Sequence, residues 1–258
     1  MTIFQTAQRS SHLDPSENVI FQRHRIAYVK TAKMINGKVL EIGCGEGYGI
    51  KELSPKSEQY FAIDKYIPNI KESLNKKNNI IFKQMKVPPL RGILDNSIDF
   101  VITFQVIEHI KNDKFFVAEI FRVLKPGGKL ILTTPNKLMT LTRNPWHIRE
   151  YTPPQMLEIL QTVFKEINIK GVFGKEKIIE YYEKNKKSVS RYARWDIFNL
   201  QYLLPSGLLQ IPYDILNRLN RKKLQHNNNE LVTAVTIDDY YIDTIKDNCF
   251  DFYCIATK

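Results

Sequence analysis

Alternating glycines follow a short apolar run near the N-terminal end of the chain, and their type and spacing could seat a ligand. The run Val39–Ile42 contains one acidic residue, Glu41, and glycines stand at positions 43, 45, 47 and 49. Glycine has no side chain and tolerates positive φ, so backbone amides in such a turn can approach a ligand closely. The carboxylate of Glu41 could meet an ammonium group of that ligand, directly or through water. The pattern indicates a cofactor site in this turn.

The glycine spacing argues against a dinucleotide. A pyrophosphate-binding fingerprint has glycine at its first, third and sixth places, and the sixth place here is Tyr48. Asp64 ends the next apolar run, Tyr60–Ile63, where the second strand of a βαβ unit should finish. A carboxylate in that place can accept both hydroxyls of a ribose. The turn and the acid together predict a cofactor that contains a nucleoside but no pyrophosphate.

On these residues the sequence resembles the class I S-adenosylmethionine-dependent methyltransferases. The resemblance covers residues 20–174 and the last ten, and it rests on the ranges 39–49, 95–110 and 124–136 together with Asp64. The segments Phe104–Ile110 and Leu124–Gly128 are similar to the small-molecule, type 11 branch. The resemblance implies transfer of a methyl group from S-adenosylmethionine to an oxygen or nitrogen of a small-molecule acceptor, by in-line displacement without a covalent intermediate.

The resemblance also implies which residues hold the cofactor. Gln84 and Met85 stand where the family has a polar or acidic residue for the adenine edge, and Phe104 and Gln105 stand where it contacts the methionine end. Cys44 is interpreted as a small residue that fills the turn, not as a catalytic thiol. The complete predicted set is Glu41, Gly43, Cys44, Gly45, Gly47, Tyr48, Asp64, Lys65, Gln84, Met85, Phe104 and Gln105.

Three side chains near the expected crevice could act as a general base. His147 is the first choice, in a connection that leaves the ligand-facing end of the sheet, and His109 and Glu108 are the others. A structural role, as a hydrogen-bonded histidine or a helix cap, is the alternative for each. No metal site is expected, because the three cysteines lack metal-ligand spacing.

The elements that must position these residues form an α/β fold of the Rossmann-like, doubly wound type. Seven mostly parallel strands are predicted, the last one antiparallel, preceded by a helix from Ser16 whose His24, Arg25 and Tyr28 could line the site. Residues 1–174 and 248–258 are predicted to form the catalytic domain, and residues 175–247 a helical cap inserted between strands six and seven. Pro212 is predicted to begin one of the cap helices.

Charge and composition limit the partners. The net charge is +11, with 13 basic and 6 acidic residues in the range 165–225. This excess invites an RNA or protein methyltransferase as an alternative, but it is spread along the chain and no RNA-binding module is appended, so nucleic acid is not favoured. A lid is preferred to a peripheral membrane anchor for the cap. A non-catalytic cofactor-binding protein is the remaining alternative, and the oligomeric state is not indicated.

The expected compartment is the cytoplasm. Residues 1–18 lack the apolar core of a signal peptide. The three cysteines are an odd number without framework spacing, which fits a reducing environment.

Overall fold

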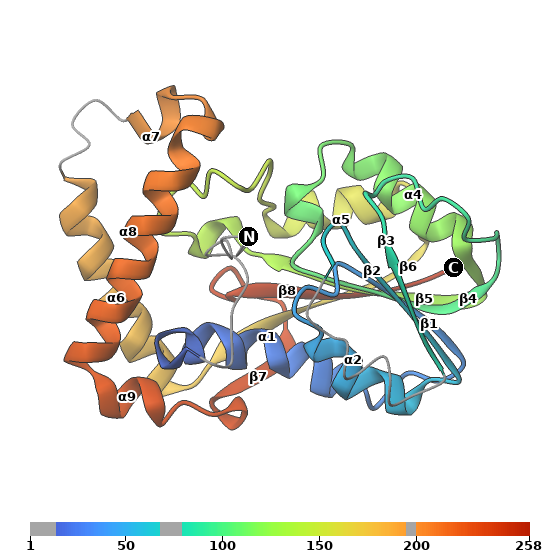
Figure 1. Cartoon of the computed structure of the whole chain (residues 1–258), viewed down its shortest axis with the longest axis horizontal. Coiled ribbons are helices and arrows are strands. Elements are labelled where there is room, and N and C mark those ends of the chain that lie inside the picture. Colours follow the sequence, from blue (N-terminus) through green and yellow to red (C-terminus); the bar gives the residue numbers. More distant parts are fainter. Residues whose placement is uncertain (1–13, 68–78, 195–199) are drawn as a thin grey trace.

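One sheet of eight strands organises the chain, whose computed structural model describes residues 14–67, 79–194 and 200–258 (Figure 1). The strand order is β3-β2-β1-β4-β5-β8-β6-β7. The strands are β1 (Lys38–Ile42), β2 (Gln59–Asp64), β3 (Ile80–Gln84), β4 (Ile98–Phe104), β5 (Leu124–Pro135), β6 (Glu166–Gly174), β7 (Tyr240–Thr244) and β8 (Asp251–Thr257). The predicted α/β class and doubly wound sheet are confirmed, with one strand more than expected.

The first five strands pair in parallel, and the sheet is completed by antiparallel pairs. β8 lies between β5 and β6 and runs antiparallel to both, as the sequence predicts for the last strand. The added strand, β7, extends the edge by pairing antiparallel with β6. Because parallel strands end on the same side of a sheet, the segments after β1, β2 and β4 meet at one crevice.

Helices cover both faces of the sheet, as alternation along β1 requires. Val39 belongs to the core on the side of α1 (Asn18–Thr31), whereas Leu40 and Ile42 belong to the core on the side of α4 (Asp113–Val123). α2 (Tyr48–Leu53) shares the face with α1, and α5 (Pro153–Gln161) shares the face with α4 (Figure 1). The Asn112 side chain caps α4 by accepting from the amide of Phe115.

The segment between β6 and β7 is helical, as expected for the cap. It contains α6 (Glu176–Ala193), α7 (Leu200–Leu203), α8 (Ser206–Asn227) and α9 (Asn229–Thr233), and α6 and α8 lie side by side at one end of the molecule (Figure 1). The prediction that Pro212 begins a helix is wrong, because α8 starts at Ser206 and the proline lies inside it.

The range predicted for the cap also holds strand β7, which belongs to the sheet. Residues 1–13 and 68–78 of the predicted catalytic domain, and residues 195–199 of the predicted cap, lie outside the described residues.

The outer surface of the cap carries several exposed apolar side chains. Leu208, Ile211, Ile215 and Leu219 follow one another along α8 at helical spacing, and each is more than half exposed. In the described part of the chain, no helix is both long enough and apolar enough to cross a membrane.

Candidate active site

The glycine turn after β1 has the backbone shape that its sequence predicts. Gly43, Gly45 and Gly47 have φ values of +81°, +52° and +82°, in the left-handed region that favours glycine. The amides of Gly43 and Cys44 donate to the carbonyl of Ile63, which fastens the turn to the end of β2. A Cβ added at Gly45 would have no atom within 4 Å, so this glycine borders open space.

Asp64 lies at the end of β2 directly beside this turn. Its Oδ2 accepts from the amide of Gly45 at 2.9 Å, and its Oδ1 accepts from the amide of Tyr66 at 2.8 Å. The side chain is buried but lines the cavity described next. The carboxylate is therefore held in a fixed orientation by two backbone amides.

A cavity of about 400 Å³ opens over the turn, and we call it the turn cavity. Nine of the twelve predicted cofactor residues line it: Gly43, Cys44, Gly45, Tyr48, Asp64, Lys65, Met85, Phe104 and Gln105. His24 and Tyr28 of α1 also line it, as does Trp146 from the connection after β5. Arg25 faces Glu52 of α2 instead, with its Nε 3.3 Å from the carboxylate.

Three predicted cofactor residues lie outside the lining of the turn cavity. The side-chain amide of Gln84 donates to the carbonyl of Lys65 at 3.0 Å, and Gly47 precedes α2. Glu41 is 1% exposed, and its two oxygens accept from the hydroxyls of Tyr28 at 2.9 Å and Tyr60 at 2.5 Å. The Glu41 carboxyl thus has two hydroxyl partners beneath the turn.

A second cavity of about 270 Å³ lies between the sheet and the cap, and we call it the cap cavity. Its walls carry many side chains that both donate and accept hydrogen bonds: Asn136, Asn144, Asn185, Asn217, Asn220, Tyr181, Tyr182 and Tyr213. His24, Gln105 and His109 line both cavities. The two cavities therefore meet at these three residues.

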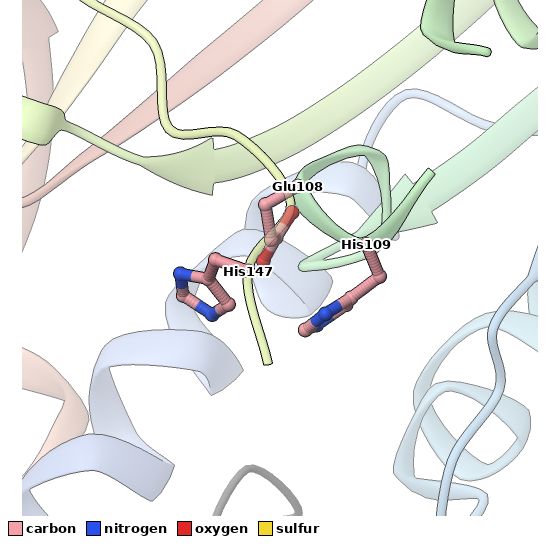
Figure 2. Close-up of side chains that lie close together, drawn as sticks. All are labelled: Glu108, His109 and His147. Atoms are coloured by element: carbon pink, nitrogen blue, oxygen red, sulfur yellow. The ribbon is translucent and has the colours of Figure 1, made fainter. Parts of the chain in front are cut away.

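Glu108, His109 and His147 converge beside this meeting point (Figure 2). Glu108 and His109 come from the 3-10 turn Ile107–His109 after β4, and His147 comes from the connection after β5. The carbonyl of Glu108 accepts from the amides of Ile148 at 2.7 Å and Arg149 at 3.2 Å, which ties the connection to the turn. All three side chains line the cap cavity.

Each histidine has a defined hydrogen-bond partner at Nδ1. His109 Nδ1 is 2.9 Å from the carbonyl of Trp146, and His147 Nδ1 is 2.5 Å from Oε1 of Glu150. The Nε2 of His147 lies 2.9 Å from the side-chain amide of Asn144. The hydroxyl of Thr134 donates to Oε2 of Glu108 at 3.0 Å.

Burial changes the charge of these groups. It lowers the pKa of His109 to about 4, with a smaller electrostatic contribution from the nearby His147, so the His109 imidazole is neutral at pH 7. It raises the pKa of Glu108 to about 7, against the opposing effects of His147 and the Thr134 hydrogen bond. His24 has its pKa lowered to about 3 by burial and by Arg23 and Arg221.

Several residues of the site were not predicted. One is Arg23, which lines the cap cavity, with its Nε 3.1 Å from Oδ2 of Asp251, the buried first residue of β8. The cap asparagines also went unrecognised, because their positions on α6 and α8 become neighbours only after the cap folds back onto the sheet. Gln105, by contrast, was predicted from its place at the end of a parallel strand that faces the crevice, and the structure adds that its φ of +57° marks a strained backbone there.

Comparisons with known proteins identify a methyltransferase domain in this chain. A family model described as a methyltransferase domain, of type 11, matches residues 40–132. A protein of Mycolicibacterium smegmatis named "Probable S-adenosylmethionine-dependent methyltransferase" is 34% identical over 164 residues, 61% of this chain and 63% of that protein. The chain thus spans less than two thirds of the length of this relative.

Two further similarities are to a named O-methyltransferase and to a solved methyltransferase structure. The mitochondrial ubiquinone biosynthesis O-methyltransferase of Mus musculus is 35% identical over 107 residues, 39% of this chain and 29% of that protein. The crystal structure of an S-adenosylmethionine-dependent methyltransferase from Archaeoglobus fulgidus superposes with a TM-score of 0.53 at 14% identity, over 93% of this chain and 94% of that one. At that identity the structural likeness concerns the fold alone.

Proposed function

Because this chain carries a class I S-adenosylmethionine-dependent methyltransferase domain of the type 11 branch, we propose that it transfers a methyl group to a small molecule held in the cap cavity. The observation that carries the proposal is the meeting of the two cavities at His24, Gln105 and His109. A methyl donor in one cavity and an acceptor in the other would face each other there. In-line displacement requires such an arrangement of two bound reactants.

The groups that line the turn cavity suit S-adenosylmethionine, the methyl donor. Asp64 offers carboxylate oxygens for the ribose hydroxyls, the border of Gly45 is open for close approach, and Met85 offers an apolar contact for the adenine. Phe104 and Gln105 both line the turn cavity, and Gln105 also lines the cap cavity, so the methionine end would lie beside them. When bound, S-adenosylmethionine supplies a methyl group on a positively charged sulfur, which a nucleophile can displace.

The walls of the cap cavity favour a polar acceptor. Five asparagines and three tyrosines make the wall polar, and Asn136, Asn220 and Tyr182 among them also bond within the protein. A molecule with several hydroxyl or amino groups therefore suits this wall better than an apolar one. The mouse relative is named an O-methyltransferase, which supports oxygen as the acceptor atom. We therefore propose a hydroxyl group as the preferred nucleophile and an amine as the alternative.

The proton of the acceptor is proposed to leave toward the cluster of Glu108, His109 and His147. His109 is neutral at pH 7 because burial lowers its pKa to about 4, and its Nδ1 hydrogen is directed at the Trp146 carbonyl. Its Nε2 therefore carries a lone pair at the junction of the cavities. His147 was the first choice among three candidate bases, but both of its ring nitrogens are hydrogen-bonded, which favours a positioning role for it.

The cap is proposed to act as a lid over the acceptor. Residues of α6 and α8 form one wall of the cap cavity, so the cap excludes water from the junction. The alternative, a membrane-facing surface, rests on the exposed apolar side chains along α8. Sedimentation with anionic lipid vesicles distinguishes the two, since a lid that only covers the site stays in the supernatant.

Methyl-labelled S-adenosylmethionine and size-fractionated cell extract test the proposed function. We expect label in the small-molecule fraction with the natural chain. The Asp64→Ala variant, which should bind the methyl donor less tightly, should give much less label. Label in the RNA or protein fraction would instead support one of the macromolecular alternatives. No label in any fraction, together with a stable bound partner, would support a non-catalytic role.

A further inference from the structure

The cluster of Glu108, His109 and His147 has a geometry that a general base alone does not require. One ligand atom from each residue lies within 4.8 Å of the other two (Figure 2). Within residues 14–67, 79–194 and 200–258, this is the only group of three or more His, Cys, Asp or Glu side chains placed to hold one ion. Two imidazoles and one carboxylate are a ligand set that divalent first-row transition metals accept in proteins.

The hydrogen bonds around the cluster set the tautomer of each histidine. His109 Nδ1 faces a carbonyl oxygen, which only accepts, so Nδ1 carries the hydrogen and Nε2 carries the lone pair. His147 Nδ1 faces the carboxylate of Glu150, whose other oxygen accepts from the hydroxyl of Thr140 at 2.5 Å. Metal-binding histidines usually donate their second N–H to a carbonyl or carboxylate in this manner. Both histidines are therefore oriented as metal ligands would be.

The carboxylate ligand is supported in the same way. Glu108 is 1% exposed, and the Thr134 hydroxyl fixes its Oε2. Ligating carboxylates are themselves commonly hydrogen-bonded, because the bond holds them in one orientation. The only described hydrogen bond that competes with an ion is the one from the Asn144 amide to Nε2 of His147. Binding of an ion would exchange this bond for coordination.

We propose that Glu108, His109 and His147 bind one divalent transition-metal ion, such as Zn²⁺, in the wall of the cap cavity. Three protein ligands leave coordination positions open, and all three side chains line the cavity in which the acceptor is proposed to lie. With the ion bound, Nε2 of His109 would be a ligand and not the base. An acceptor hydroxyl bound to the ion would have its pKa lowered, and its proton would pass to water in place of His109. This use of the ion rests on the proposed function, whereas binding of the ion does not.

Titration calorimetry of the full chain with ZnCl₂, after removal of bound metal with a chelator and of any affinity tag, tests the site without a methyl acceptor. We expect one Zn²⁺ per chain and at least about tenfold weaker binding for each of Glu108→Gln, His109→Gln and His147→Gln. His226→Gln is the matched control, since His226 is exposed on the cap and should leave the affinity unchanged. Absence of stoichiometric binding, or equal binding by all four variants, would overturn the proposal.

Two further variants keep the test decisive if a ligand variant fails to fold. Asn144→Ala removes the competing amide and should tighten Zn²⁺ binding, while Glu150→Gln weakens the support of His147 and should loosen it about 10-fold to 100-fold. Circular dichroism and the affinity for S-adenosylhomocysteine report whether each variant is folded. An affinity for Zn²⁺ that is the same in both variants as in the natural chain would contradict the proposed site. A chain that binds Zn²⁺ but transfers no methyl group would contradict only the proposed function.

Discussion

At the scale of single residues, the glycines of the turn have two different surroundings. Gly45 borders the open turn cavity, whereas Gly49 packs against the buried carboxyl of Glu41. A Cβ added at Gly49 would lie 2.2 Å from Oε1 of Glu41 and 2.5 Å from the Tyr28 ring, so this glycine makes room for the buried carboxyl. Burial raises the pKa of Glu41 to about 7, although the Tyr60 and Tyr28 hydroxyls oppose the shift. The carboxyl therefore links the stability of the fold to pH.

The sign of that linkage gives a prediction for Glu41→Gln. Because the folded pKa lies above the ordinary value of 4.5, the contribution of Glu41 is fully present below about pH 4.5 and is lost as pH rises through about 7. The free energy of unfolding of the variant, relative to the natural chain, should rise across this range by about 3 kcal/mol at most. Urea unfolding of both chains at several pH values measures this difference.

Comparing the two chains at each pH cancels the titration of His24 and His109, which both retain. Those histidines act in the opposite direction, since burial lowers their folded pKa values. A difference between the two chains that stays constant from pH 4.5 to pH 8 would contradict the raised pKa of Glu41.

Asp64→Ala is predicted to weaken binding of S-adenosylhomocysteine by about tenfold to hundredfold, as expected for loss of hydrogen bonds to a charged group. The substitution removes the acceptor for ribose hydroxyls and also releases the amides of Gly45 and Tyr66. Calorimetric titration measures the affinity. Asp95→Ala is the control, because Asp95 lies on the surface beside Arg122. Equal affinity in the Asp64→Ala chain would remove this residue from the cofactor site.

The residues that sequence reasoning placed at the turn cavity depend on local backbone chemistry. Gly43, Gly45 and Asp64 sit at strand ends whose direction follows from the apolar runs before them, so their positions were predictable. Glu41 was expected to meet an ammonium group of the ligand, which stays a prediction, and its two hydroxyl partners could not be read from the sequence. Tyr28 and Tyr60 come from α1 and β2, and their hydroxyls reach Glu41 only in the packed fold.

At the scale of elements, the connection after β5 holds the cap in place. The Trp146 ring nitrogen donates to Asp214 of α8 at 3.0 Å, and the hydroxyl of Tyr182 on α6 donates to the carbonyl of Met139 at 3.3 Å. The same connection carries His147 to the cluster beside β4. One loop therefore positions both the cap and a side chain of the site.

Arg143→Ala is predicted to loosen the start of α8. The Arg143 guanidinium donates to the carbonyl of Gln201 at 2.6 Å and to the hydroxyl of Ser206 at 2.7 Å, joining α7 to α8. Loss of such charged hydrogen bonds should speed amide exchange in residues 200–210 by about tenfold to hundredfold. Hydrogen exchange with mass spectrometry measures the exchange rates, with β4 as an internal reference. The Arg143→Lys variant should show a rate between those of the natural chain and Arg143→Ala. Unchanged exchange in residues 200–210 would show that α8 is held by other contacts.

Two elements were mispredicted because tertiary contacts outweighed local signals. Strand β7 was assigned to the cap from the length of the insertion, yet residues 240–244 gain a full set of antiparallel partners on β6. Proline favours a first helical turn, so α8 was expected to begin at Pro212. The six residues before it are helical as well, and Ser206 among them is held by Arg143.

At the scale of the whole molecule, the positive charge is balanced near the site. Lys65 and Lys86 line the turn cavity together with Glu46 and Asp64. The two arginines of the cap cavity each face a buried carboxylate, with Arg23 Nε 3.1 Å from Asp251 and the Arg221 guanidinium 3.4 Å from Glu17. Charges neutralised in this way have little to offer to phosphates, so the net charge of +11 does not form a nucleic-acid surface at the described site.

We therefore predict that transfer RNA binds this chain only weakly and is not methylated by it. Attraction from scattered surface lysines should be measurable near 50 mM salt and should fall steeply toward 200 mM, because it depends on counterion release. Filter binding across this salt range, with labelled S-adenosylmethionine in a parallel reaction, measures both quantities. Arg23→Gln should leave the weak binding unchanged, since its partner is Asp251 and not a phosphate. Tight binding of transfer RNA that persists at 200 mM salt, with methyl label in the RNA, would contradict the proposed small-molecule acceptor. It would indicate that the cap cavity holds a nucleotide of the RNA.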